Sequence, residues 1–322
     1  MTDRKIFLTG ANGYVGRNLI RQFVASGVEV TGLVRNEAAA SLVTKLGAHA
    51  VIGDMLIGDL APFMSGADVL IHAAADLDHG PGEESAKHNI EGTRRVLIAA
   101  KMAGIGTVIH LSTDSVLQDG RPLQNVNEST PYPKKPAGAY SRGKAKAEQL
   151  ALSQASDDFR VVVLRPRFVW GRDDGTALPR IVENVRSGRF AWIAKGDYLS
   201  STTHIANLCH AVELAMDKGV SGEIYHISDG AARTFRETLT GLLATQGLQA
   251  PEKSVPRGLL KAIARVSDTL YRLSNGRIKG PLSFQEYATS AVEISLDISK
   301  AERELGYVPS ISWEQGLAEL QR

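Results

Sequence analysis

The sequence predicts an α/β protein built on a doubly wound parallel sheet, and three observations support this fold class. Short, continuously apolar runs alternate with helical patterns through the first half of the chain, as expected for strands buried on both faces. A glycine-rich turn, TGANGYVG at 9–16, joins the first such run to the first helical pattern. After Pro166 the alternation loosens, and about the last ninety residues are mostly helical in pattern. A smaller, mostly helical C-terminal lobe is therefore expected.

Each element of the predicted sheet follows from its own pattern. The first helix, within 13–27, places apolar side chains on one face and stops at Gly27. Those side chains are Val15, Leu19, Ile20, Phe23 and Val24. The expected strands are 5–10, 29–35, 49–54, 68–74, 107–113, 160–166 and 222–228. The other helices expected to cover this sheet are 37–47, 83–104 and 140–154.

The second half contains further expected elements. Helices are predicted at 178–186 and 205–216, and the run at 189–194 (RFAWIA) resembles a strand. Two segments near the end, SKAE at 299–302 and SWEQ at 312–315, fit the capping-box pattern at a helix start.

The composition excludes some classes of function but does not identify the function. The 322 residues carry a net charge of +2, which gives no indication of nucleic-acid binding. One cysteine, Cys209, excludes an internal disulfide, and its apolar helical surroundings predict a buried structural thiol. We find no secretory signal and no apolar stretch of the ~20 residues that a membrane-spanning helix needs. A cytoplasmic protein is expected.

The glycine turn has the context of a phosphate-binding loop. Gly10, Gly13 and Gly16 follow a predicted strand and open a predicted helix. Glycine allows a sharp turn and a close backbone approach to a pyrophosphate, which the helix N-terminus can bind. Taken alone, the same pattern also suits an ordinary strand–helix turn.

Tyr140 and Lys144, in YSRGK, are four residues apart and therefore share one face of a helix. A phenol has a pKa near 10, and a neighbouring ammonium lowers it. The pair could therefore exchange a proton with a carbonyl or alcohol oxygen. The alternative is a chance pair on a solvated helix.

Ser112 and Thr113, in HLSTDSV, come at the end of a predicted strand. Doubly wound folds bind ligands at this carboxyl edge, where a hydroxyl could hold a substrate carbonyl. The alternative is a strand-end turn that uses hydroxyls as local hydrogen-bonding groups.

These three features occur together and in order, and with them the chain resembles the short-chain dehydrogenase/reductase superfamily. The TGxxGxxG spacing matches the extended branch, the NAD-dependent epimerase/dehydratase superfamily. Other matching segments are HAAAD, NIEGTRRVLIAA, LRPRFVWG, GEIYHISDG and DISKAERELGYVPSISWEQGL, so the resemblance covers essentially the whole chain. Within the branch, the chain looks most like the 3β-hydroxysteroid dehydrogenase-like group.

The resemblance implies a Rossmann-type NAD(P)-binding domain and assigns the site residues. That domain would be 1–170, with 204–228 returning to it, and the substrate-binding lobe would be 171–203 and 229–322. Tyr140 would be the catalytic acid or base, Thr113 would align with the catalytic serine or threonine, and Lys144 would bind the nicotinamide ribose and tune Tyr140. The other cofactor-binding positions would be Gly10, Asn12, Gly13, Tyr14, Val15, Gly16, Asp54, Met55, Ala73, Ala74, Asn89, Pro166, Phe168 and Val169.

Cofactor choice is predicted from the end of the second strand. An acidic residue there would bind the adenosine ribose hydroxyls, but this chain has Arg35 followed by Asn36. A guanidinium can pair with a 2′-phosphate and stack on adenine, so NADP(H) is favoured. If Arg35 only covers the adenine, NAD(H) remains usable.

The predicted function is hydride transfer between the nicotinamide and a ketone or secondary alcohol of a bulky, largely apolar, steroid-like substrate. The alternatives are a nucleotide-sugar epimerase or dehydratase that retains NAD, and a non-enzymatic NADP(H)-sensing protein. No metal site is expected, because His72 and His79 lack the spacing of a zinc-binding set.

Two parts of the chain are candidates for contact with a larger partner, either a second copy of the chain or a membrane surface. Pairing of the helices 83–104 and 140–154 into a homodimer is common in the family. The helical pattern at 257–273 carries an apolar stripe with basic residues elsewhere, and we expect it to pack on the substrate lobe. The alternative is peripheral contact with a membrane surface or a hydrophobic substrate entrance.

Overall fold

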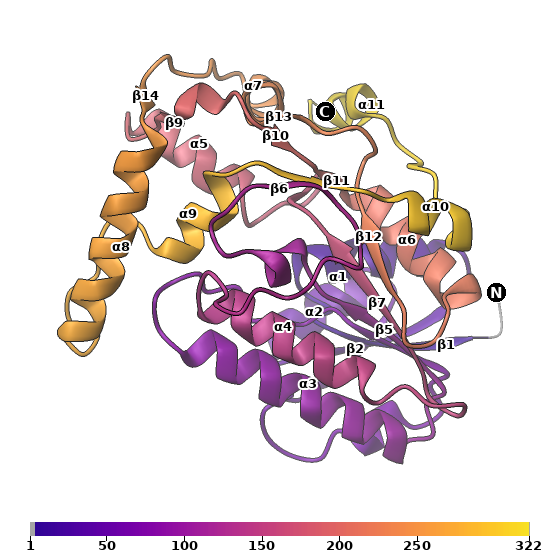
Figure 1. The fold of residues 1–322 in the computed structure, drawn as a ribbon. Coiled ribbons are helices and arrows are strands. Elements are labelled where there is room, and N and C mark those ends of the chain that lie inside the picture. The colour runs from indigo at the N-terminus through magenta and orange to yellow at the C-terminus, as the bar shows by residue number, and fades with distance from the viewer. Residues whose placement is uncertain (1–3, 322) are drawn as a thin grey trace.

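The computed structural model describes residues 4–321, and its central feature is a seven-stranded parallel sheet (Figure 1). Residues 1–3 and 322, at the outer limits of the two predicted lobes, lie outside the described residues. The strands are β1 (Lys5–Thr9), β2 (Glu29–Val34), β3 (His49–Ile52), β4 (Val69–His72), β5 (Thr107–Leu111), β7 (Arg160–Pro166) and β12 (Ile224–Ile227). Their order is β12-β7-β5-β4-β1-β2-β3, which confirms the predicted doubly wound fold.

The strand order reverses direction between β1 and β4. The chain runs outward from β1 through β2 to β3, and then returns to the other side of β1 with β4. The loops that follow β1 and β4 therefore diverge to opposite faces and leave a crevice at the carboxyl edge. Ligands of open α/β sheets bind at such a switch point.

Helices cover both faces of the sheet because side chains alternate along each strand. Ile6 and Leu8 of β1 face one layer, formed by α1 (Tyr14–Ala25), α2 (Glu37–Lys45) and α6 (Ile205–Lys218). Phe7 faces the other layer, formed by α3 (Glu84–Met102) and α4 (Ala139–Leu152). Figure 1 shows α3 and α4 side by side below the sheet.

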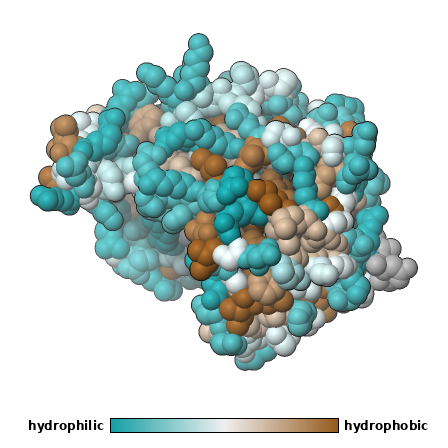
Figure 2. Space-filling view, turned by 90° about the horizontal axis from the view of Figure 1, so that it is seen from below, coloured by the Kyte–Doolittle hydropathy of each residue, from teal (hydrophilic) through white to brown (hydrophobic). Residues whose placement is uncertain are grey.

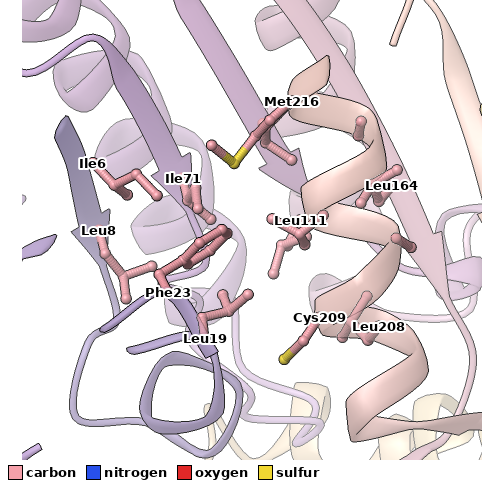
Figure 3. Packing of buried hydrophobic residues seen from close by; sticks show 14 of the residues in the cluster. Ile6, Leu8, Leu19, Phe23, Ile71, Leu111, Leu164, Leu208, Cys209 and Met216 are labelled. Carbon is pink, nitrogen blue, oxygen red and sulfur yellow. The ribbon is translucent and has the colours of Figure 1, made fainter. Parts of the chain in front are cut away.

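The core between α1, α6 and the sheet is apolar throughout (Figure 3). Leu19 and Phe23 of α1 lie in the same cluster as Leu208 and Met216 of α6. Cys209 belongs to this cluster, and burial raises the pKa of its thiol to about 12. A thiol in this state is an unreactive packing group, as expected from its surroundings in the sequence.

The C-terminal lobe is mostly helical, and beside the large sheet the chain forms short strands, of which the sequence predicted only the one within 189–194. A four-stranded sheet has the order β13-β10-β15-β6, and two short pairs are β11–β8 and β14–β9. The strands are β6 (Leu123–Val126), β8 (Val169–Trp170), β9 (Trp192–Ile193), β10 (Leu199–Ser200), β11 (Thr203–His204), β13 (Arg233–Thr234), β14 (Ser254–Val255) and β15 (Ile294–Leu296). The helices are α5 (Leu178–Arg186), α7 (Phe235–Thr245), α8 (Arg257–Leu273), α9 (Phe284–Ser290), α10 (Ser299–Leu305) and α11 (Trp313–Leu320), and the 3₁₀ turns are η1 (Ala61–Met64), η2 (Asp114–Leu117) and η3 (Ala194–Gly196).

Two local predictions were wrong, and each has a backbone reason. The strand expected at 189–194 is reduced to Trp192–Ile193, because the chain turns at Ala194 and Lys195, where φ is positive. The SKAE capping box does not form, since Ile298 precedes α10 and Ser299 is already helical. The second box is confirmed: Ser312 and Gln315 cap α11 reciprocally.

Candidate active site

The glycine loop is packed too tightly for any side chain. A Cβ on Gly16 would lie 2.2 Å from the carbonyl oxygen of Gly10, and one on Gly10 would lie 2.8 Å from the Ala74 nitrogen. Gly10 also has a positive φ of 71°. The loop itself therefore requires glycine at Gly10 and Gly16.

The N-terminus of α1 fits an anionic group. Gly13 precedes the helix without a side-chain cap, and the first turn contains no acidic residue. The first backbone N–H groups of a helix have no intrahelical partner, and they concentrate positive charge. Asn12 and Gly13 are exposed at the tip of the loop, with Tyr14 and Val15 half-buried behind them. This arrangement suits the pyrophosphate of a dinucleotide.

A buried imidazole fixes the loop against the end of β4. His72 Nδ1 lies 2.7 Å from Thr9 Oγ1, and its Nε2 lies 2.9 Å from Thr93 Oγ1 on α3. Thr9 Oγ1 also accepts a hydrogen bond from the Ala74 nitrogen. Burial lowers the pKa of His72 to about 3, so the ring is neutral at physiological pH. The predicted cofactor positions Ala73 and Ala74 are thereby held beside the glycine loop.

Helix α4 brings the predicted tyrosine and lysine to the edge of the sheet. Tyr140 and Lys144 are both buried, and Lys144 Nζ donates a 2.7 Å hydrogen bond to the carbonyl oxygen of Leu111, at the end of β5. Gly143, between them, allows the close approach of α3, because a Cβ there would lie 2.5 Å from the Cα of Ala86. The pair thus faces the sheet rather than solvent.

One turn further along, α4 is anchored to β7. The Glu148 carboxylate accepts hydrogen bonds from the Arg165 guanidinium, and both side chains are fully buried. The Tyr132 hydroxyl donates to the same carboxylate. A buried pair with its hydrogen bonds satisfied holds a fixed geometry, and breaking it by removing one partner is costly.

Thr113 lies beside Tyr140 at the start of η2. Its Oγ1 accepts a hydrogen bond from the Ser115 nitrogen and donates to the Asp114 carboxylate at 3.3 Å. Ser112 is buried, and within residues 4–321 its hydroxyl has no hydrogen-bond partner. Thr113, rather than Ser112, therefore contacts Tyr140, because a hydrogen bond with Thr113 shifts the pKa of the Tyr140 phenol.

The charge states of the pair differ from the sequence-based expectation. Burial, and then the nearby Asp114 carboxylate, raise the pKa of Tyr140 above its usual value, while a hydrogen bond between the Tyr140 and Thr113 side chains lowers it. Burial lowers the pKa of Lys144 to about 8, although Glu148 favours its charged form. Lys144 does not lower the pKa of Tyr140 in this arrangement, since its ammonium is directed to Leu111. The phenol remains protonated at neutral pH.

A buried polar cluster next to Thr113 was missed by the sequence analysis. Asp114 Oδ2 accepts a 2.7 Å hydrogen bond from Gln118 Nε2 and lies 3.6 Å from Arg167 Nη1. Burial raises the pKa of Asp114, and Arg167 partly offsets this effect. The only sequence signals were the position of Asp114 after Thr113 and that of Arg167 after Pro166.

His79, expected to be only a loop residue, contacts the tyrosine. The two rings have centroids 4.4 Å apart. The carbonyl oxygen of His79 accepts a hydrogen bond from Ser283 Oγ, immediately before α9. The loop after β4 therefore links the C-terminal lobe to Tyr140.

Four further residues that were predicted to bind the cofactor lie after β2, after β3 and on α3. Arg35 is exposed directly after β2, with no acidic residue at that strand end. The Asp54 carboxylate accepts a hydrogen bond from the Leu56 nitrogen, and Met55 packs against Gly92 of α3. Asn89 holds the loop after β4, since its side chain bonds both backbone groups of Asp76.

Three predicted positions lie at the other end of the crevice. Pro166 is buried at the end of β7, where it pairs with Ile227, and Val169 begins β8. Phe168, between them, has a positive φ of 38°. These residues occupy the same edge of the sheet as Thr113.

The fold and site together define a nucleotide-binding α/β enzyme with a buried tyrosine–lysine pair at the carboxyl end of β5. The sequence model of the NAD dependent epimerase/dehydratase family matches residues 6–228. The chain therefore belongs to this family, and the resemblance to the extended short-chain dehydrogenases/reductases is confirmed.

Similar proteins include reductases and dehydrogenases. The chain is 41% identical to 4-hydroxy-2-methyl-3-oxo-4-farnesyl-3,4-dihydroquinoline-1-oxide ketoreductase of Stigmatella aurantiaca, covering 99% of this chain and 96% of the relative. It is 28% identical to a 3-beta-hydroxysteroid dehydrogenase of Mycolicibacterium neoaurum, over 98% and 90% of the two chains. The structure of the dTDP-glucose 4,6-dehydratase DesIV of Streptomyces venezuelae, with NAD bound, superposes with a TM-score of 0.77 at 25% identity, over 98% and 95%.

We predict that Gly16→Ala weakens dinucleotide binding at least about tenfold and destabilises the fold by about 1–3 kcal/mol, the usual range for overpacking. The reason is the 2.2 Å approach to the Gly10 carbonyl oxygen. Fluorescence titration with NADPH and NADH and thermal unfolding measure the two effects. The control is Gly106→Ala, where the added Cβ meets no atom within 4 Å. Equal behaviour of the two variants would contradict the prediction.

Proposed function

We propose that this protein is an NADP(H)-favouring ketoreductase that acts on a bulky, largely apolar ketone. The observation that carries the proposal is that Thr113, Tyr140 and Lys144 meet at the carboxyl end of β5, with only β4 between this strand and β1, which leads into the glycine loop. The substrate would lie between the sheet edge and the lobe formed by 171–203 and 229–322, below the loop that carries His79.

In the proposed mechanism, the reduced nicotinamide supplies a hydride to the carbonyl carbon when the cofactor is bound. Tyr140 donates its phenolic proton to the carbonyl oxygen, so that the product is a secondary alcohol. Thr113 orients the same oxygen through its hydroxyl. Lys144 would hold the nicotinamide ribose through its ammonium, the role that the family resemblance implies.

The charge state of Tyr140 suits the role of proton donor in carbonyl reduction. A buried phenol with a raised pKa is a proton donor at neutral pH rather than a base. The Asp114 carboxylate strengthens this tendency, because a second negative charge nearby disfavours the phenolate. Oxidation of an alcohol would need the opposite charge state at the start.

The substrate class is supported by the relatives described above. One is named as a ketoreductase of a farnesylated quinoline oxide and another as a hydroxysteroid dehydrogenase, both of which act on large apolar ring systems. The first covers 99% of this chain, including the C-terminal lobe. A large hydrophobic ketone is the substrate that fits this similarity.

Arg35 supports the preference for NADP(H). Its side chain is exposed just beyond β2, and Asn36 caps α2 through the Ala39 nitrogen and is not available as a ribose ligand. A guanidinium in this position offers charge-assisted hydrogen bonds to a 2′-phosphate.

The retained-NAD epimerase or dehydratase alternative makes a different prediction about the purified protein. Such an enzyme would carry bound nicotinamide and turn over without added cofactor. A ketoreductase requires stoichiometric NADPH. An NADP(H)-sensing protein would bind the cofactor but would not need Tyr140.

The first test is Tyr140→Phe. We expect kcat for ketone reduction to fall about 10²- to 10⁴-fold, the range typical of losing a general acid, while NADPH binding is unchanged. Steady-state assays over a panel of apolar ketones measure the loss, and fluorescence titration measures binding. The control is Tyr225→Phe, since that hydroxyl bonds Glu304 and Val220 far from the site. Unchanged turnover in Tyr140→Phe would refute the catalytic assignment.

A second test concerns the cofactor. We expect Arg35→Ala to raise the KM for NADPH about tenfold, the effect of losing a charged hydrogen bond, and to leave the KM for NADH unchanged. Arg303→Ala, on an exposed part of α10, is the matched control. Equal or better turnover of the unmodified protein with NADH would overturn the proposed preference.

A further inference from the structure

Helix α8 exposes an apolar face to solvent. Leu259, Ala262, Val266, Leu270 and Leu273 recur at intervals of three and four residues and are all exposed. Val266 is 57% exposed and Leu273 is 78% exposed. Figure 1 shows α8 projecting along the edge of the molecule, away from the central sheet. The helix packs on the lobe as expected, with Leu260 against the cluster around Tyr287 of α9, but Val266, Leu270 and Leu273 of the predicted stripe are exposed.

The helix is held to the lobe by a different face. Ala264 and Ser267 are its buried residues, and the Asp268 carboxylate accepts a hydrogen bond from the Phe284 nitrogen at the start of α9. With 3.6 residues per turn, this face lies roughly opposite the stripe defined above. Docking of α8 on the lobe thus leaves the apolar stripe without a partner in residues 4–321.

Basic side chains surround the stripe. Between Arg257 and Lys279 the chain has six basic residues and one acidic residue, a net charge of +5 in a chain whose total is +2. The acidic residue, Asp268, is turned toward α9. Arg265 and Arg272 follow one side of the stripe, and Arg277 and Lys279 are exposed just beyond the end of the helix. In Figure 2, hydrophobic surface appears at the left margin, where α8 projects, among hydrophilic residues.

We infer that the exposed face of α8 docks on an anionic lipid surface, with Leu259, Val266, Leu270 and Leu273 inserted among the acyl chains at the headgroup boundary. An apolar stripe flanked by basic residues is the pattern of helices that lie in a membrane interface. The charge complements anionic headgroups, which attract each nearby lysine or arginine. Among the described residues, no helix is both long and apolar enough to cross a bilayer, so contact would be at the surface.

The docking helix is connected to the candidate active site. The Tyr271 hydroxyl on the inner side of α8 approaches Gly82, where an added Cβ would lie 3.2 Å away. Gly82 belongs to the loop that carries His79, whose ring contacts Tyr140. If the proposed function holds, a membrane-dissolved ketone would be delivered beside this loop. Docking itself does not depend on that function.

The experiment is flotation of the full chain with vesicles of phosphatidylcholine containing about 30% phosphatidylserine, compared with phosphatidylcholine alone. We expect binding to the anionic vesicles to exceed binding to the neutral ones at least about tenfold and to weaken in about 0.5 M salt. The triple variant Val266→Gln/Leu270→Gln/Leu273→Gln should lose at least about tenfold of this binding. Its unfolding temperature should stay unchanged, because all three side chains are exposed.

The control variant is Ile57→Gln/Val308→Gln, which removes two apolar side chains that are 69% and 68% exposed elsewhere on the surface. Its binding should match that of the unmodified chain. Absence of binding to anionic vesicles, or equal binding by the triple variant, would overturn the inference. So would a dimer in sedimentation velocity that the triple variant converts to monomers, because the stripe would then be covered by a second copy. Flotation requires no turnover, so failure here leaves the proposed reductase activity untouched.

Discussion

The position of α4 relative to the end of β5 is the constraint on which the candidate active site depends. The hydrogen bond from Lys144 Nζ to the Leu111 carbonyl oxygen joins the helix to the strand that carries Thr113. The absence of a side chain at Gly143 brings α4 against α3, and the buried Glu148–Arg165 pair ties its next turn to β7. With α4 held in these three ways, Tyr140 has little freedom to move away from Thr113.

The position of α4 also determines the pKa values of Tyr140 and Lys144. Burial of α4 at the sheet edge removes water from Tyr140 and Lys144, which favours the neutral form of each. Asp114 opposes the phenolate, and Arg167 and Gln118 hold that carboxylate in place. The result is a proton donor next to an ammonium whose pKa is about 8. The site is therefore prepared to donate a proton, which is the requirement for carbonyl reduction.

The sequence predicted the parts of this structure that depend on local pattern. The seven strands of the large sheet were placed within about two residues, because continuous apolar runs mark strands buried on both faces. Tyr140, Lys144 and the glycine loop were found because their spacing is itself the geometric requirement. Two-residue strands such as β10 and β14 have no periodicity to detect, and β6 was not predicted. His79 and Arg167 reach the site through tertiary contacts that no spacing reveals. Helix α8 packs on the lobe as predicted, but it leaves Val266, Leu270 and Leu273 exposed.

The central claim is that Tyr140 and its neighbours support net hydride transfer to a ketone. The most direct measurement follows deuterium from NADPH labelled at nicotinamide C4, with an apolar ketone as acceptor and mass spectrometry of the product. The account predicts deuterium at the carbinol carbon of the alcohol, in amounts equal to the NADP⁺ formed. Product without deuterium, or a bound cofactor that shows no net oxidation during turnover, would contradict it.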